Sequence, residues 1–218
     1  VFKGLSLGYP TRVQGSSTLL LQDCAPNAQH VKLVFPARDN MPKVAMPEVE
    51  VHWYDGGMMP DRPEGFPQGK ELMGEGGGLC IFHGTKDTLI CGCYGVNPWL
   101  LSGRKPNVPQ TLRRVKDAMK GGHEQDWIRA CKESAGSRVQ TKSNFLEAGP
   151  FNEMVVMGVL AVRLQRLNKE LLWDGPNMRF TNIDPNETIK IIKKDTFEVI
   201  DGDPKFKTEW TDPINAQE

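Results

Sequence analysis

The longest apolar run in the chain, MVVMGVLAV at 154–162, is the feature that most restricts how this sequence can fold. It is far shorter than the roughly 20 residues that a membrane-crossing helix needs, so we expect no membrane span. Gly149 and Pro150 precede the run, and proline is common at the first position of a helix. The pattern predicts a helix that begins near Pro150 and lies buried, because it is apolar on every side.

Segments rich in β-branched and aromatic residues lie on both sides of this helix. Strands, then helices, then strands again are typical of an α+β domain with a mostly antiparallel open sheet and helices packed on one face. We expect one such domain over residues 1–218. Strands are predicted at 12–24, 30–35, 49–54, 79–83, 88–93, 171–173 and 178–181, and a terminal hairpin is predicted between 189–194 and 197–201, before a polar tail.

Two further helices are predicted between the strands, at 111–120 and 124–132. In the second, Trp127, Ile128 and Cys131 form one apolar stripe. Such a stripe predicts contact with a core.

The opening residues, VFKGLSLGYP, are typical of the last turns of a helix that stops at Gly8-Tyr9-Pro10. Because the sequence does not start with methionine, we expect residues 1–7 to be the tail of an upstream helix. A signal peptide would then also lie upstream, so a cytoplasmic location and export are both compatible with the sequence.

The best hairpin candidate joins 79–83 to 88–93 in a register that places Cys80 opposite Cys91. Both faces of this hairpin are largely apolar, which predicts central strands covered on both sides. Five cysteines are an odd number, so a complete set of disulfides within the chain is impossible. Buried thiols, a zinc site that adds His83 and Cys93, and a Cys80–Cys91 disulfide in an oxidising compartment all stay open.

The charges disfavour a role in binding polyanions. Lys+Arg and Asp+Glu both number 27, so no net field attracts nucleic acid or an anionic membrane. The one glycine-rich run, GEGGG at 74–78, has neither the spacing of a dinucleotide fingerprint nor a following helix. This run is therefore predicted to be a flexible loop rather than a nucleotide site. From the balanced charges we expect no nucleic-acid partner.

The stretch HWYDGGMMPDRP at 52–63 is the best candidate for a functional loop. We predict that a substrate pocket or a domain interface is lined by Trp53, Tyr54, Asp55 and Arg62. A strand followed by an irregular turn, with no role in binding, would give the same pattern.

The start of the apolar helix is a second candidate. Asn152 and Glu153 are expected in its first turn, where unsatisfied N–H groups favour polar or anionic ligand atoms. The simpler alternative is that Glu153 only complements the helix dipole.

Six segments, taken in order, resemble one protein family over residues 4–182. They resemble the C-terminal domain of bacterial Gfo/Idh/MocA-type oxidoreductases, in the branch that carries W-Y-D-G-G and N-M-R-F-T-N. The segments are LGYPT (7–11), HWYDGGMMPDRPE (52–64), CGCYGVNPWLL (91–101), WIRACK (127–132), SNFLEAGPFNEMVVMGVLAVRL (143–164) and LLWDGPNMRFTN (171–182). After Asn182 the sequence departs from the family pattern, so 183–218 is a divergent segment.

The resemblance implies that a missing N-terminal Rossmann domain binds NAD or NADP. This second domain would bind a sugar or cyclitol with a reactive secondary alcohol and form homo-oligomers through a sheet face. The family's cofactor loop and its catalytic lysine and histidine motifs are not in this sequence, so we expect no cofactor and no activity in this chain alone. Two alternatives are a non-enzymatic carbohydrate-binding or scaffold domain and part of an NAD-dependent glycoside hydrolase.

Overall fold

The computed structural model describes residues 1–20, 25–39, 48–72, 77–108, 121–189, 192–201, 203–210 and 214–215. The chain divides into two compact units: a larger one of Phe2–Met59 with Phe145–Glu218, and a smaller one of Pro60–Asn144 with Val1. Within the described ranges each unit contains antiparallel sheet and one α-helix, which confirms the α+β class. The predicted helix at 111–120, Cys24 and most of GEGGG lie outside the described residues.

The larger unit is built on a five-stranded sheet in the order β3-β2-β1-β7-β8. Every neighbouring pair whose register is resolved is antiparallel. The predicted strands here are confirmed, with β1 ending earlier than expected. Their bounds are β1 Arg12–Ser17, β2 Gln29–Phe35, β3 Val49–Tyr54, β7 Leu171–Asp174 and β8 Arg179–Phe180.

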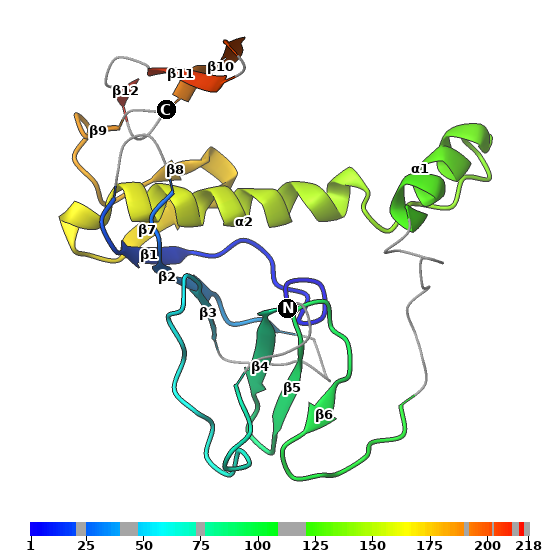
Figure 1. Cartoon of the computed structure of the whole chain (residues 1–218). Coiled ribbons are helices and arrows are strands. Elements are labelled where there is room, and N and C mark those ends of the chain that lie inside the picture. The colour runs from blue at the N-terminus through cyan, green and yellow to red at the C-terminus, as the bar shows by residue number, and fades with distance from the viewer. Residues whose placement is uncertain are drawn as a thin grey trace. The chain divides into compact units, whose positions relative to one another are not determined.

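Helix α2 (Phe145–Arg163) packs on one face of this sheet (Figure 1). Two glycines allow the close approach. A Cβ at Gly15 would lie 2.6 Å from the Val162 backbone nitrogen, and a Cβ at Gly158 would lie 3.3 Å from Cγ1 of Val31. The core between helix and sheet consists of Leu7, Val13, Val31, Leu33, Phe35, Met157, Ala161, Val162, Leu164, Leu171, Phe180 and Ile183.

The prediction that α2 begins near Pro150 and is buried all round is wrong. The helix begins at Phe145 and contains Pro150 inside it. Of its residues, only Met157, Gly158, Ala161 and Val162 are buried, because the sheet covers a single face. The exposed residues on the other face include Val155, Val156 and Val159.

By length and composition alone, α2 is also long and apolar enough to cross a membrane. Helices that pack in the core of a globular domain meet the same criterion, and α2 packs on the sheet through its buried residues. The expected absence of a membrane span therefore stays a prediction.

The C-terminal segment forms a hairpin other than the predicted one. Strand β10 (Ile192–Ile200) runs through both segments that were expected to pair with each other, and it pairs instead with β11 (Asp203–Trp210). The expected polar tail is therefore largely a strand. A separate short pair joins β9 (Thr188–Ile189) to β12 (Ile214–Asn215).

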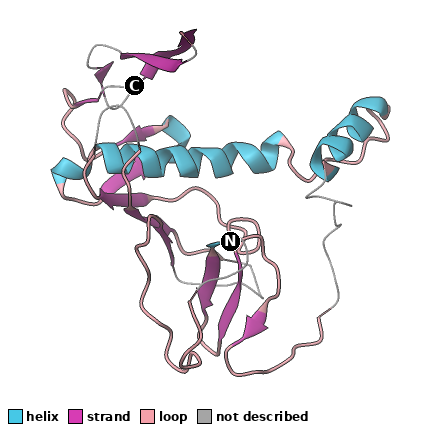
Figure 2. Ribbon diagram, viewed as in Figure 1, coloured by secondary structure: helices cyan, strands magenta, loops and turns pink. Residues whose placement is uncertain are grey.

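The smaller unit contains the three-stranded sheet β4-β5-β6 (Figure 2), with bounds Leu79–His83, Thr88–Gly92 and Trp99–Leu100. The predicted register is confirmed, since Cys80 pairs with Cys91. The prediction that both hairpin strands are central is wrong. Strand β4 is an edge strand with intermediate burial, because β6 adds to β5 alone.

Helix α1 (Gly122–Lys132) confirms the predicted helix but not its buried side. Trp127 is 64% exposed, while Asp126 and Ala130 are buried. The cause is a polar contact: Asp126 accepts a hydrogen bond of 3.0 Å from the Lys142 backbone N–H, so the segment after the helix folds back over its polar side. Ile128 and Cys131 of the predicted stripe are likewise exposed.

Residues 2–7 have the hydrogen-bond pattern with which helices end. The Leu7 N–H donates to the Phe2 carbonyl at 2.9 Å and the Ser6 N–H donates to the Lys3 carbonyl at 3.1 Å. Ser6 has a positive φ of 48°. Together these features form a Schellman motif, which usually places glycine at this position.

Candidate functional site

Asp55 ends β3 and ties it to the start of β2. Its carboxylate accepts hydrogen bonds from the Gln29 backbone N–H at 3.0 Å, from Gln29 Nε2 at 2.9 Å and from Trp53 Nε1 at 2.9 Å. Desolvation opposes the charge, but the donors on Trp53 and Gln29 outweigh it and lower the pKa of Asp55. The carboxylate is ionised, and its hydrogen-bond partners are groups of the chain itself. Asp55 therefore holds the loop in shape by joining the end of β3 to the start of β2.

The double glycine of the same loop has two different roles. A Cβ at Gly56 would lie 2.0 Å from the Asn27 carbonyl oxygen and 2.4 Å from Cα of Ala28, and Gly56 has a φ of +65°. Gly57 has a φ of +91°, and a Cβ there would meet nothing within 4 Å. Gly56 therefore lets the loop pass against the backbone before β2, whereas Gly57 supplies only a left-handed turn conformation.

Trp53 and Tyr54 point to opposite faces of the sheet, as neighbours on a strand must. The Trp53 side chain is 59% exposed although its indole N–H is bound to Asp55. The Tyr54 ring stacks on His30 with centroids 4.5 Å apart. Of the pair, Trp53 alone presents a large exposed ring surface on which a ligand could stack.

A histidine pair lies beside Tyr54 on the polar face of the sheet. His30 Nε2 and His52 Nδ1 are 3.0 Å apart, so one ring donates and the other accepts. His52 Nε2 lies 3.2 Å from a carboxylate oxygen of Glu50. Burial first, and then the charges of His52 and Lys32, lower the pKa of His30. The sequence motifs gave no sign of this pair, but the register of β2 against β3 would have revealed it.

Asn152 and Glu153 do not lie in the first turn of α2, because the helix begins at Phe145 rather than near Pro150. Their expected contact with orphaned helix N–H groups therefore does not exist. Glu153 instead accepts a hydrogen bond of 3.0 Å from Trp173 Nε1, which fastens α2 to β7. Asn152 is exposed.

Arg62 belongs to the smaller unit, where it organises the loop that follows it. Its guanidinium donates to the Pro67 carbonyl at 3.3 Å and to the Lys70 carbonyl at 3.0 Å. The same group lies 4.9 Å from the centroid of the Phe66 ring. The hydrogen bonds of Arg62 thus go to its own loop, just as those of Asp55 in the larger unit go to nearby parts of the chain.

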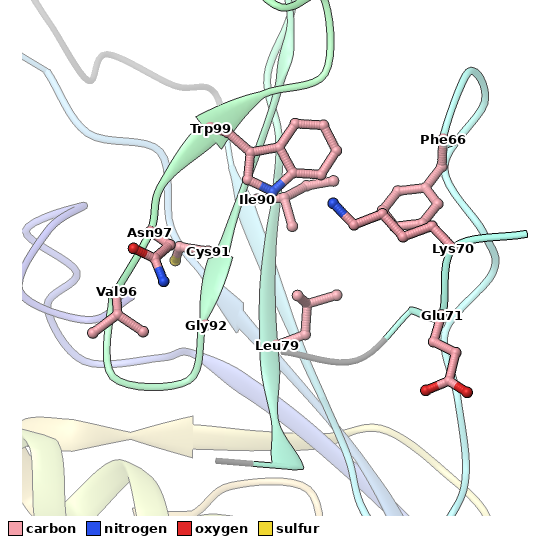
Figure 3. A pocket seen from close by; sticks show the side chains of 10 residues that line it. All are labelled: Phe66, Lys70, Glu71, Leu79, Ile90, Cys91, Gly92, Val96, Asn97 and Trp99. Carbon is pink, nitrogen blue, oxygen red and sulfur yellow. The ribbon is translucent and has the colours of Figure 1, made fainter. Parts of the chain in front are cut away.

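A cavity of about 280 Å³ lies in the smaller unit between this loop and the three-stranded sheet. Figure 3 shows the Phe66 and Lys70 side chains reaching from the loop towards Trp99 and Ile90. The Lys70 ammonium lies 4.8 Å from the centroid of the Trp99 ring. Leu79, Cys91 and Asn97 complete much of the lining.

Aromatic and aliphatic walls with an ammonium group at the rim can hold a small molecule that has one apolar face and several polar groups. Burial, followed by the charge and hydrogen bond of Cys80, raises the pKa of the Cys91 thiol in the wall. A raised pKa keeps that thiol protonated and weakly nucleophilic at neutral pH. The described lining therefore favours the binding of a small molecule.

The sequence did not single out Phe66, Lys70 and Trp99 as cavity residues. The β4–β5 hairpin separates Phe66 and Lys70 from Trp99, and of the three only Trp99 lies in one of the six segments that carry the resemblance. Among the described side chains, no group of three or more His, Cys, Asp and Glu residues is arranged to hold a metal ion. No protein-family model matches this sequence, and no curated protein matches it.

Proposed function

We propose that this chain is the substrate-binding and oligomerisation domain of an NAD(P)-dependent oxidoreductase that acts on a secondary alcohol of a sugar or cyclitol, and that it is inactive alone. Two lines support the proposal. Six segments resemble Gfo/Idh/MocA-type oxidoreductases in their order. The fold is α+β, with an antiparallel sheet and a helix packed on one face.

Several of the six segments contact one another in the larger unit. A Cβ at Gly175 would lie 3.3 Å from the Tyr9 ring, and the Trp173 N–H donates to the Thr11 carbonyl at 2.8 Å. The Trp173 indole N–H also donates to the Glu153 carboxylate at 3.0 Å, which joins the segment 143–164 to the segment 171–182. Some of the residues that carry the resemblance therefore take part in the packing of the larger unit.

The observation that carries the proposal is the uncovered apolar stripe of α2. Phe151, Val155 and Val159 follow one another at four-residue spacing and are 47%, 46% and 54% exposed. Covering such residues stabilises a complex by about 1 kcal/mol each. In an oxidoreductase of this type, a cofactor domain of the same protein can cover the stripe.

The site residues then fall into two groups. The first group makes contacts within the chain that shape its own loops, strand and helix: Tyr54, Asp55, Arg62 and Glu153. Trp53 and Asn152 are exposed, and we assign to them the contact with the substrate or with the cofactor domain.

The test begins with the coding sequence that precedes Val1, where a G-x-G-x-x-G/A fingerprint after a strand is expected. The full-length protein should then reduce NAD or NADP with one member of a panel of sugars and cyclitols. The isolated chain should show no thermal stabilisation by either cofactor. A full-length protein that binds sugar without cofactor would instead be a carbohydrate-binding domain, and NAD-dependent cleavage of glycosides would identify a hydrolase.

Substitution of α2 tests the stripe itself. Val155→Glu with Val159→Glu in the full-length protein should expose α2 to hydrogen exchange and lower kcat, because the cofactor domain no longer docks. Tyr94→Glu is the matched control, since Tyr94 is 70% exposed and lies in the smaller unit. Equal behaviour of both proteins would refute the docking role of α2.

A further inference from the structure

The smaller unit holds two cysteines that face each other across neighbouring strands. Cys80 on β4 and Cys91 on β5 are direct partners in the antiparallel register. Such partners have Cα atoms about 4.5–5.5 Å apart, which lies within the range that a disulfide spans. Side chains of directly paired residues project from the same face of the sheet, so the two thiols lie side by side, and after burial Cys80 contributes to the raised pKa of Cys91.

We propose that Cys80 and Cys91 form a reversible dithiol–disulfide pair that responds to low-molecular-weight disulfides such as oxidised glutathione. This proposal is independent of the oxidoreductase function, since it needs only the β4–β5 hairpin.

Accessibility decides the order of the two chemical steps. Cys91 is 7% exposed, whereas Cys80 is half-buried and lies on the edge strand of the sheet. The Cys80 thiolate attacks one sulfur of oxidised glutathione, and the electron pair of the broken S–S bond leaves with a glutathione thiolate. Cys91 then loses its proton to water, attacks the Cys80 sulfur and releases the second glutathione. Two protein thiols are oxidised, and one glutathione disulfide is reduced to two thiols.

Cys93 is less well placed than Cys91 to form a disulfide with Cys80. A Cβ at Gly78 would lie 2.8 Å from Cβ of Cys93, so Cys93 continues the register opposite Gly78. Cys80 and Cys93 are therefore diagonal neighbours, with Cα atoms about 7–8 Å apart. A disulfide at that separation requires the backbone to move.

The bond would also fix one wall of the cavity. Cys91 lines the cavity together with Phe66, Lys70 and Trp99, so the oxidised hairpin holds the wall more rigidly against β4. The bond would also close the short loop between the two strands, which restricts the unfolded chain and stabilises the folded state.

The experiment equilibrates the full chain in glutathione buffers of rising oxidised-to-reduced ratio, then alkylates the remaining thiols and maps them by mass spectrometry. Cys80 and Cys91 should become protected together and appear as one cross-linked pair of peptides. Cys131 on α1 is exposed and serves as the internal control for the labelling of an unpaired surface thiol. Oxidation should raise the thermal midpoint by several degrees.

Variants separate the pair from general oxidation. Cys80→Ser should leave Cys91 open to alkylation on unfolding and should abolish the rise in midpoint, whereas Cys131→Ser should preserve both the bond and the rise. Cys91→Ala removes the other partner of the bond and provides a second test if Cys80→Ser does not fold. A lasting glutathione adduct on Cys80, a bond from either cysteine to Cys24, or a Cys80–Cys91 pair that stays reduced while Cys131 reacts would each overturn the proposal.

Discussion

The two compact units are held together in different ways. Among the described residues, the larger unit buries a core cluster of twelve residues between α2 and its sheet, whereas the buried cluster of the smaller unit consists of Phe66, Leu72 and Ile90. The smaller unit relies more on side chains that bind the backbone, such as Arg62 on its loop and Asp87 at the turn of its hairpin. Both units have polar anchors, since Asp55 binds the Gln29 backbone in the larger unit, but close packing contributes more to the stability of the larger unit.

The largest expected effect is at Gly56, where packing in the larger unit is tightest. Gly56→Ala should lower the free energy of unfolding by about 3 kcal/mol or more, because its Cβ would overlap the backbone at Asn27 and Ala28. Gly57→Ala is the matched control and should cost about 1 kcal/mol, from its positive φ alone. Urea unfolding measures both. Equal losses would show that the backbone before β2 moves aside without cost.

Core truncations test the comparison directly. Phe180→Ala should cost about 4 kcal/mol, and Ile90→Ala about 2–3 kcal/mol, because a small core with half-buried neighbours can collapse around the deletion. Hydrogen exchange should rise in β1 and β2 for the first variant and in β4, β5 and β6 for the second. If Ile90→Ala also released protection in β1, the two units would unfold as one.

The hydrogen bond between Ser102 and Asp87 is a polar anchor of the smaller unit that can be removed without changing a core residue. Ser102→Ala removes the 2.5 Å hydrogen bond from the Ser102 hydroxyl to Asp87. That hydroxyl is the largest cause of the lowered pKa of Asp87, so the pKa should rise towards its ordinary value. Local opening of β5 and β6 should increase several-fold. An NMR titration of the carboxyl group measures the pKa, with Ser143→Ala as the control; an unchanged Asp87 pKa would contradict the anchor.

The smallest expected effect is a pH dependence that belongs to the larger unit. The pKa of His30 is lowered in the folded state by burial, His52 and Lys32, so the unfolded chain binds the proton more readily. Stability from this group is therefore complete above the ordinary pKa of about 6.5 and declines as the pH falls below it. Thermal melts should show a decline of about one or two degrees between pH 7 and pH 5. His30→Gln should flatten this part of the profile, and an unaltered slope would assign the effect to other groups.

Much of the local structure was predictable. The bounds of β3 and the pairing of Cys80 with Cys91 follow from period-two alternation and from the length of the turn, which are properties of neighbouring residues. The helix at 124–132 was also found. Its buried side was not, because Asp126 packs through a bond to Lys142 that no apolar pattern encodes.

The candidate site was predictable only as a list of residues. Trp53 and Asp55 are joined by a hydrogen bond, as neighbours in one motif can be, but the partner Gln29 lies 26 residues before Asp55. The cavity residues Phe66 and Trp99 meet only because β6 pairs with β5 and the loop after Arg62 folds back. Their contact leaves no pattern in the sequence.

The class of fold, most strands before residue 182 and the register of the Cys80–Cys91 hairpin follow from the sequence alone, since they depend on periodicity and turn chemistry within a few residues. The face of α2 that is covered, and the contacts of Asp55 and Gly56 with residues 27–29, become visible only in the folded structure. The physical reason is that burial and hydrogen-bond partners depend on which distant segments become neighbours. The sequence of a helix that is apolar on every side does not indicate which side the sheet will cover.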